Sequence, residues 1–265
     1  MLDPLLQTIV LGLIQGFAEW LPISSTAHLR IAELFLGLTA TPLFGVVLHL
    51  GTLIVVILYF RTDIWKILSA LVHLNFRSDD GQVIPLIIVA TVPTAIIGLL
   101  YVTFLEDSLQ TILAIGITFL AGATLVYVSK IGRDNKETIT YFMALIMGTA
   151  QGFAIFPGLS RSGATISFGL LLGLRREKAF KFSFLLSIPA ILGDFIVEAY
   201  KERGQLTTQM MGTTELLVGT IVAMISGYIA IRLVQKTVAS KRFHYFAVYT
   251  GILGVILIAL ALNGF

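Results

Sequence analysis

Long apolar stretches dominate the chain. Six of them hold about 20 mostly apolar residues, the length that a transmembrane helix needs. They lie at roughly 42–60, 82–103, 110–129, 179–199, 213–235 and 245–263. The pattern therefore predicts six transmembrane helices.

Two further apolar stretches, near 5–38 and 139–174, are interrupted by residues that a membrane-spanning helix avoids. Pro22 breaks the first stretch, and Pro157 followed by Gly158 breaks the second. Proline removes a backbone hydrogen bond and ends or kinks a helix. We interpret both stretches as re-entrant helical hairpins, which enter and leave the membrane on the same face.

The two broken stretches are related by an internal repeat. A shift of 136 residues aligns Gln15–Ala18 with the identical Gln151–Ala154 and gives 12 identities over positions 12–50, against roughly 3 or 4 expected by composition. Each repeat, approximately 1–130 and 137–265, holds one hairpin and three spans. An odd number of spans places the second copy upside down, so we expect a functional site near the membrane midplane, where the two halves meet.

Composition agrees with a membrane protein. Only 12% of the residues are charged, and the mean hydropathy of +0.93 is too high for a soluble domain of this size. The expected fold class is an all-α integral membrane protein that forms a single membrane domain over residues 1–265. The absence of cysteine excludes thiol chemistry and thiolate metal sites, so a metal would have oxygen or imidazole ligands, which favours Mg²⁺ or Ca²⁺.

Basic residues are distributed unevenly between the two predicted faces. The loops of one face carry 14 Lys and Arg residues, and those of the other carry three: Arg30, Lys201 and Arg203. We expect the protein in a plasma membrane, and the positive-inside rule places the first face on the cytoplasmic side of that membrane. Both termini are then expected outside, with the site opening outward. Because the basic residues serve orientation, no nucleic-acid partner is expected, and a homodimer stays an open alternative.

The first hairpin contains a concentration of polar side chains. Gln15 and Glu19 are four residues apart and share one helical face. A run of hydroxyls and one imidazole follows the Pro22 break: Ser24, Ser25, Thr26 and His28. An ionised side chain such as Glu19 at membrane depth costs at least about 2.5 kcal/mol, which makes a functional role the default expectation.

The second hairpin sets one guanidinium among hydroxyls and glycines. Arg161 is surrounded in sequence by Gly158, Ser160, Ser162, Gly163 and Thr165. Arginine forks onto phosphate oxygens, and glycine lets the backbone approach an anion closely. A new helix is expected to start after each break, so two positive helix ends would face one another. These features predict a site that binds a phosphate group.

Simpler explanations exist for several of these residues. A Ser-Ser-Thr run after proline is commonly a helix cap, and Glu19 with Arg161 could be an ion pair that only joins the hairpins. His28 alone could serve packing. We assign structural roles to His49, His73 and His244, which have no polar cluster around them in sequence, and a solvated outer-edge role to Asp194 and Glu198.

Two segments together resemble the signature motifs of the bacitracin-resistance type undecaprenyl-diphosphate phosphatases. They are Gln15-x-x-x-Glu19 followed by Leu21–His28, and Pro157–Thr165. The resemblance covers essentially the whole chain. It implies hydrolysis of a polyprenyl diphosphate to the monophosphate and inorganic phosphate, which recycles the lipid carrier of cell-wall glycan synthesis and confers bacitracin resistance. It also implies a divalent cation.

The same resemblance assigns roles to individual residues. Glu19 matches the acidic metal-binding or catalytic residue, Ser25 the proposed nucleophile, His28 the imidazole beside it, and Arg161 the diphosphate clamp. Gln15 stands where many members have a second glutamate, which puts a two-carboxylate metal site in doubt. The neighbouring hydroxyls and glycines, Ser24, Thr26, Gly158, Ser160, Ser162, Gly163 and Thr165, are expected to contact the substrate.

Two questions stay open in the sequence. Ser25 could attack phosphorus with His28 as general base, or Glu19 and His28 could activate water directly. An inverted-repeat carrier for a polyprenyl phosphate lipid is the alternative function, because broken helices are typical of transporters. A membrane acid phosphatase is excluded, since no Pro-Ser-Gly-His string occurs.

Overall fold

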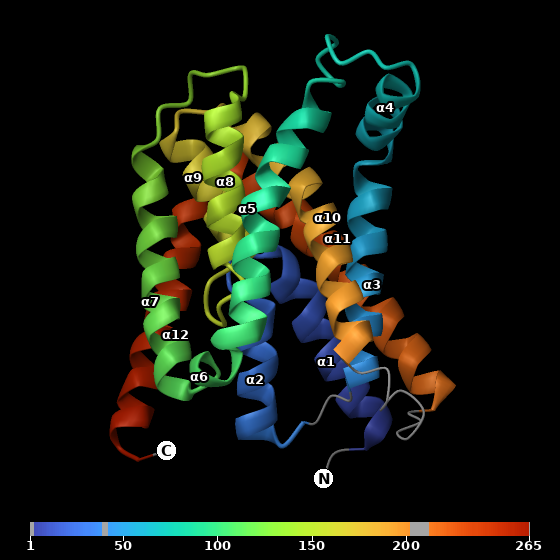
Figure 1. Cartoon of the computed structure of the whole chain (residues 1–265). Helices are drawn as coiled ribbons and strands as arrows, with labels where there is room; N and C mark the ends of the chain where they lie inside the picture. Colours follow the sequence, from blue (N-terminus) through green and yellow to red (C-terminus); the bar gives the residue numbers. More distant parts are fainter. Residues whose placement is uncertain (1–2, 39–41, 202–211, 265) are drawn as a thin grey trace.

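The computed structural model describes residues 3–38, 42–201 and 212–264, and these residues form helices and loops without a β-strand. The helices are α1 (Pro4–Trp20), α2 (Ser25–Leu36), α3 (Pro42–Tyr59), α4 (Arg61–Val72), α5 (Val83–Phe104), α6 (Glu106–Leu109), α7 (Ile112–Val128), α8 (Tyr141–Phe153), α9 (Arg161–Leu171), α10 (Arg176–Lys201), α11 (Thr213–Ala239) and α12 (Phe246–Leu262), with 3₁₀ turns at Ser129–Ile131 and Phe243–Tyr245. Figure 1 shows them as one bundle.

Five helical segments among the described residues are long and apolar enough to cross a membrane: Val83–Phe104, Ile112–Ile131, Arg176–Lys201, Thr213–Ala239 and Phe243–Leu262. A sixth is obtained if α3 and α4 count as one broken span. Each predicted apolar stretch therefore coincides with a helix, and the expectation of a multi-pass, all-helical membrane protein is confirmed.

The bend between α3 and α4 was not predicted from the sequence. The segments Phe44–Tyr59 and Arg61–Val72 meet at 79°. Asp63 of α4 forms an ion pair of 2.5 Å with Lys181 near the start of α10, and this contact joins the bent segment to the bundle. Trp65 on α4 is 74% exposed, so this face of the bent helix does not pack against the bundle.

Two helix pairs turn back inside the bundle. α1 and α2 both have their outer ends at the lower side of Figure 1, and α8 and α9 have theirs at the upper side, so the two breaks come together between them. Local sequence determines where the helices end. Asp3 caps α1 by accepting a hydrogen bond from the Leu5 N–H, and α2 stops at Gly37, whose φ of +61° is a left-handed cap.

The largest buried apolar cluster fixes the inner end of α1. Trp20, 2% exposed, stacks on Phe184 of α10 with ring centroids 5.2 Å apart. Phe60 and Phe180 extend the same aromatic cluster. A rigid aromatic anchor at Trp20 holds the neighbouring Glu19 at the centre of the bundle.

Candidate active site

The candidate site is centred on Glu19, in the last turn of α1. The residue is only 6% exposed, and one carboxylate oxygen, Oε2, accepts two hydrogen bonds. Gln15 Nε2 donates over 3.0 Å from the preceding turn, and Ser25 Oγ donates over 2.8 Å from the start of α2. The structure thus brings the predicted carboxylate, amide and candidate nucleophile together.

Arg161 approaches Glu19 from the other hairpin. Its Nη2 lies 3.6 Å from Glu19 Oε1, and its buried Nη1 has no hydrogen-bond partner among the described residues. An unpaired buried guanidinium nitrogen is costly unless a ligand satisfies it. Ser25 and Arg161 occupy equivalent places, because each is the first residue of the second helix of its hairpin. An anion between them would meet a hydroxyl and a guanidinium.

His49, for which the sequence analysis expected only a structural role, belongs to this polar cluster. Its Nδ1 lies 3.2 Å from Gln15 Nε2 and 3.7 Å from Glu19 Oε2. One signal for this role is visible in the sequence, namely an ionisable side chain inside an apolar span. His73 and His244 lie elsewhere, against the Ser69 carbonyl and the Tyr245 ring respectively.

The two breaks are tied together by hydrogen bonds. Ser160 Oγ donates to the Leu21 carbonyl over 3.2 Å, and Ser162 Oγ donates to the Trp20 carbonyl over 2.8 Å. Ser160 also caps α9 by accepting from the Gly163 N–H at 3.2 Å. These predicted substrate contacts thus join the hairpins and set the distance between Glu19 and Arg161.

Two unusual backbone conformations meet at the same place. Ser24 has a φ of +68° and Gly158 a φ of +103°, and the Gly158 N–H donates to Ser24 Oγ over 3.1 Å. A positive φ is strained for serine, and such strain is typical of functional sites. Ser24 precedes α2, but its side chain makes no capping hydrogen bond. The helix-cap explanation therefore does not apply to Ser24. The N–H groups at the start of α2 stay available to bind an anion.

Three of the predicted site residues, His28, Thr165 and Thr26, make no hydrogen bond to Glu19 or to the Ser25 hydroxyl. His28 Nδ1 is 2.8 Å from the Ser24 carbonyl oxygen, and its Nε2 is 2.7 Å from the Tyr249 hydroxyl, so both nitrogens are engaged away from Ser25. Thr165 Oγ1 donates to the Arg161 carbonyl over 2.8 Å. Thr26 is exposed on α2.

The oxygen set around Glu19 fits a hard cation. Gln15 is fully buried, and its Oε1 has no hydrogen-bond partner among the described residues. The amide presents its Nε2 to the Glu19 carboxylate, so its oxygen would join Glu19 in binding a cation only after the amide turns over. No group of three His, Cys, Asp or Glu side chains in the described ranges could hold a metal. A Mg²⁺ or Ca²⁺ ion would therefore complete its coordination with water or phosphate oxygens, as is usual for Mg²⁺.

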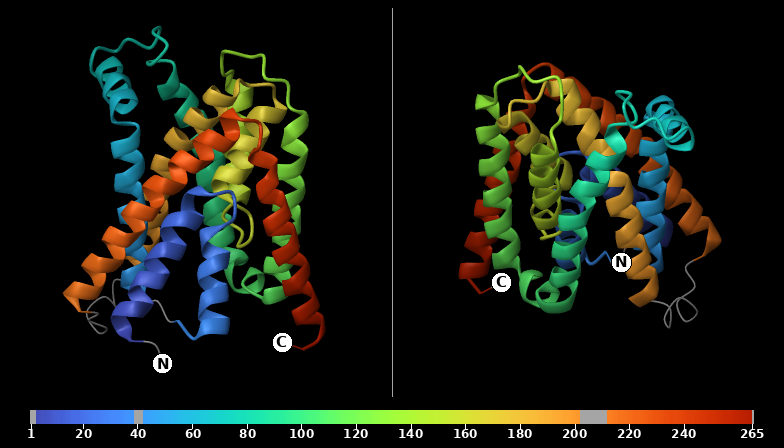
Figure 2. Two further views of the ribbon diagram at one scale, coloured as in Figure 1. Left: turned by 180° about the vertical axis from the view of Figure 1, so that it is seen from behind. Right: turned by 45° about the horizontal axis from the view of Figure 1, so that its top comes forward.

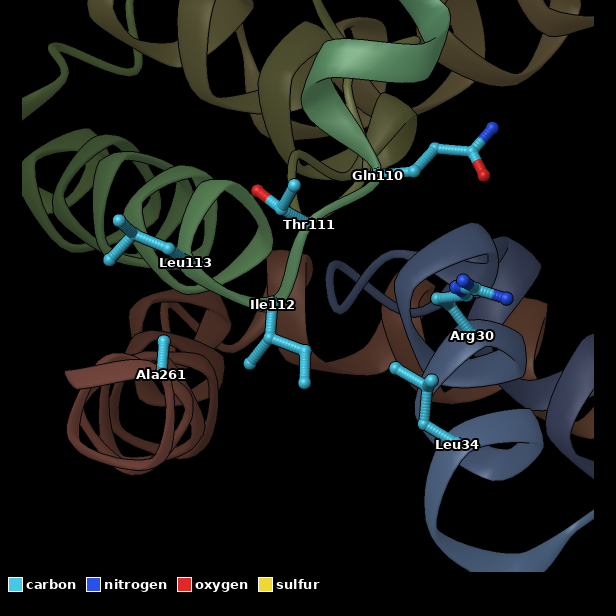
Figure 3. A pocket seen from close by; sticks show the side chains of 7 residues that line it. All are labelled: Arg30, Leu34, Gln110, Thr111, Ile112, Leu113 and Ala261. Atoms are coloured by element: carbon cyan, nitrogen blue, oxygen red, sulfur yellow. The ribbon is translucent and has the colours of Figure 1, made fainter. Parts of the chain in front are cut away.

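Residues from α10 complete the site, and the sequence analysis did not find them. A small cavity of about 10 Å³ is lined by Glu19, Trp20, Arg161, Ser162, Ser183, Phe184 and Ser187, room for about one water molecule. A larger cleft of about 580 Å³ lies between α2, the start of α7 and the end of α12 (Figure 3). None of the predicted site residues lines it.

A family profile and several named proteins match nearly the whole chain. The profile of the family described as "Bacitracin resistance protein BacA" matches residues 8–256. The chain belongs to this family. A protein named undecaprenyl-diphosphatase from Corynebacterium glutamicum is 39% identical over 97% of this chain and 91% of its own length.

Proteins with the same name from Carboxydothermus hydrogenoformans and Methanosphaera stadtmanae are 38% and 37% identical. These alignments cover 97% and 98% of this chain, and 98% and 99% of the two relatives. The similarity of the BacA-family chain to these relatives therefore includes both hairpins and every span between them.

Proposed function

We propose that this membrane protein hydrolyses undecaprenyl diphosphate to undecaprenyl phosphate and inorganic phosphate, and that it does so at the Glu19 cluster. The observation that carries the proposal is the 2.8 Å contact from Ser25 Oγ to the Glu19 carboxylate, with Arg161 beside it. Family membership and the names of the full-length relatives support the same activity. The reaction recycles the lipid carrier of cell-wall glycans, and through the family it is connected with bacitracin resistance.

The geometry favours a reaction in two displacements. Ser25 Oγ attacks the terminal phosphorus while its proton passes to Glu19, and the bond from phosphorus to the bridging oxygen breaks, which releases the lipid monophosphate. Glu19 passes the proton to the departing monophosphate. Water then attacks the phosphoserine and gives a proton to Glu19, the bond from phosphorus to Ser25 Oγ breaks, inorganic phosphate leaves, and Glu19 returns the proton to Ser25 Oγ. Glu19 is better placed than His28 to act as the base, since neither nitrogen of His28 bonds Ser25.

Charge compensation is the main task of the remaining groups. A diphosphate brings roughly two to three negative charges into a region of low dielectric, where preorganised positive groups are most effective. Arg161 offers its unpaired Nη1, and the N-termini of α2 and α9 add their dipoles. A divalent cation held by Glu19 and Gln15 would neutralise further phosphate charge.

We also propose that the two helix pairs are re-entrant hairpins of an inverted repeat. α1 packs along α11, and α8 packs along α5, so the first helix of each hairpin lies on the second span of the opposite half (Figure 2). A Cβ atom at Gly12 would lie 2.7 Å from the Gly219 oxygen, and one at its repeat equivalent Gly148 would lie 2.0 Å from the Ala90 oxygen. Equivalent glycines thus make equivalent close approaches.

Phosphate release from purified protein tests the activity directly. The wild-type protein is expected to release inorganic phosphate from undecaprenyl diphosphate, and Ser25→Ala to bind the lipid but release almost none. Ser69→Ala, which makes the same substitution at an exposed position on α4 outside the site, is the matched control and should keep most of the activity. Substantial turnover by Ser25→Ala would leave direct attack by water, and lipid movement across vesicles without phosphate release would support the carrier alternative.

A further inference from the structure

His28 is held between the two halves of the chain. Its Nδ1 lies 2.8 Å from the Ser24 carbonyl oxygen, within its own hairpin. Its Nε2 lies 2.7 Å from the hydroxyl of Tyr249, which belongs to α12 in the second half. The two rings also stack, with centroids 5.7 Å apart and planes at 16°, and Phe119 meets the imidazole edge-on.

These contacts determine the tautomer of His28. A carbonyl oxygen only accepts hydrogen bonds, so Nδ1 must carry the proton that bonds Ser24. In a neutral ring Nε2 is then an acceptor, and the hydroxyl of Tyr249 must be the donor. Tyr249 thereby keeps the N–H of His28 directed at Ser24.

The Ser24 carbonyl matters because it belongs to the strained turn that precedes the candidate nucleophile. Ser24 has a φ of +68°, and Ser25 directly follows it with its hydroxyl on Glu19. A strained conformation persists only where its surroundings over-determine it. Three contacts hold it here: the Gly158 N–H on Ser24 Oγ, and both the ring and the backbone N–H of His28 on the Ser24 carbonyl, with the ring nitrogen the nearer of the two at 2.8 Å against 3.3 Å.

We infer that Tyr249 is a positioning residue for the hydrolysis, which acts through His28 to hold the Ser24 turn and so to aim the Ser25 hydroxyl at the substrate phosphorus. The inference rests on the proposed function. It gives His28 the task of fixing the turn, and it makes the last helix of the second half a part of the catalytic apparatus of the first.

Tyr249→Phe is the direct test, because it keeps the stacked ring and removes only the donor. We expect kcat for phosphate release to fall about 3- to 10-fold, the loss of one hydrogen bond, with KM for undecaprenyl diphosphate nearly unchanged. Tyr245→Phe is the matched control, since Tyr245 lies just before α12 and is 62% exposed. It should leave both constants unchanged.

A double-mutant cycle separates positioning from simple packing. In a His28→Asn background, where no imidazole remains for the phenol to orient, adding Tyr249→Phe should change kcat by less than about twofold. Independent, additive losses would mean that Tyr249 acts without His28 and would overturn the inference. An unchanged kcat in the single variant Tyr249→Phe would do the same.

Nitrogen NMR of histidine-labelled protein tests the contact without relying on activity. The wild-type spectrum should show His28 with its proton on Nδ1, and Tyr249→Phe should shift the Nε2 resonance while leaving His73 and His244 unchanged. A His28 proton on Nε2 would refute the proposed arrangement. A wild-type protein that releases no phosphate would refute the proposed function, and the spectrum would still decide the tautomer.

Discussion

At the residue scale, Glu19 determines the chemistry of the site. Its carboxylate contacts Gln15 and Ser25 by hydrogen bonds and lies near His49 and Arg161. Breaking a buried ion pair by removing one partner costs about 3–5 kcal/mol, because the other charge stays buried and unpaired. The partners of Glu19 therefore support stability as well as reactivity, and substitutions have to be chosen to keep the charge where possible.

Arg161→Lys keeps the positive charge but removes the planar guanidinium group, which can donate two parallel hydrogen bonds. Lysine would still pair with Glu19 but offers no second planar nitrogen for a phosphate oxygen. We expect kcat/KM to fall about 10- to 100-fold, as for the loss of a charged hydrogen bond. Arg30→Lys is the control, because Arg30 pairs with Glu33 at 2.9 Å outside the Glu19 cluster, and it should retain near-normal kcat/KM. Equal activity of the two variants would contradict the bidentate clamp.

The cation requirement should depend on the charge at position 15. We expect chelation to abolish phosphate release and Glu19→Gln to abolish it at any cation concentration. Gln15→Glu should lower the half-activating concentration of Mg²⁺ or Ca²⁺ several-fold, because a second carboxylate adds an anionic ligand.

Gln110→Glu adds the same charge at an exposed position outside the site and serves as the control in a metal titration of activity. Full activity in the presence of chelator would contradict a cation site, and an equal response of the two glutamate variants would indicate a general effect of charge.

The sequence reveals only part of this cluster. Glu19, Ser25 and Arg161 could be predicted, since local motifs around two helix breaks contain them. The partners of His49, Ser187 and Tyr249 could not, because these residues come from three separate helices, and only the folded bundle brings them to the site. Single polar residues on apolar helices carry no spacing information about their partners.

At the element scale, close helix contacts place the hairpins. A Cβ atom at Gly16 of α1 would lie 2.4 Å from the Ala223 carbonyl oxygen and 2.0 Å from Ser226 Oγ of α11. Backbone atoms this close leave no room for a side chain, and small residues are the usual means of such approach in membranes. The position of Glu19, one turn along from Gly16, therefore depends on this contact.

Gly16→Ala should separate α1 from α11 and destabilise the fold by about 1–3 kcal/mol. Thermal unfolding in detergent measures the effect, and activity should fall with it as Glu19 moves. Gly193→Ala is the control, since a Cβ atom at this position in α10 meets nothing within 4 Å. Gly193→Ala should be as stable as the wild-type protein or slightly more stable. An equal loss of stability in Gly16→Ala and Gly193→Ala would show that the contact between α1 and α11 does not cause the loss.

Most elements could be predicted from the sequence, because apolar length and helix-breaking residues determine them directly. Pro22 and Pro157 located both breaks, and the six apolar stretches all coincide with helices. The 79° turn into α4 escaped prediction because neither apolar length nor a helix-breaking residue specifies the angle between two helices. The role predicted for Glu198 concerns a side chain outside the described residues.

At the scale of the whole molecule, the two ends of the bundle are expected to face opposite sides of the membrane. The start of α1 and the end of α12 lie at the same end of the bundle (Figure 1), and the α8–α9 pair enters from the opposite end. We predict that the end of α12 is external and the loop between α4 and α5 cytoplasmic. The natural sequence has no cysteine, so single cysteines can report on each face.

Asn263→Cys should react with a membrane-impermeant maleimide in sealed right-side-out vesicles. Asp79→Cys, also exposed, should react only after the vesicles are opened. The reverse labelling pattern would invert the proposed orientation, and labelling of both positions in sealed vesicles would contradict the assignment of the two ends to opposite faces.

The bonds between the hairpins also constrain how the protein is made. Ser162 follows its partner Trp20 by 142 positions, which corresponds to roughly 7–28 s of synthesis at 5–20 residues per second. During that interval Glu19 has already been synthesised, while Arg161 does not yet exist. Until the second helix pair arrives, Glu19 therefore lacks the ion-pair partner that it has in the folded protein, and the candidate site is completed only late in synthesis.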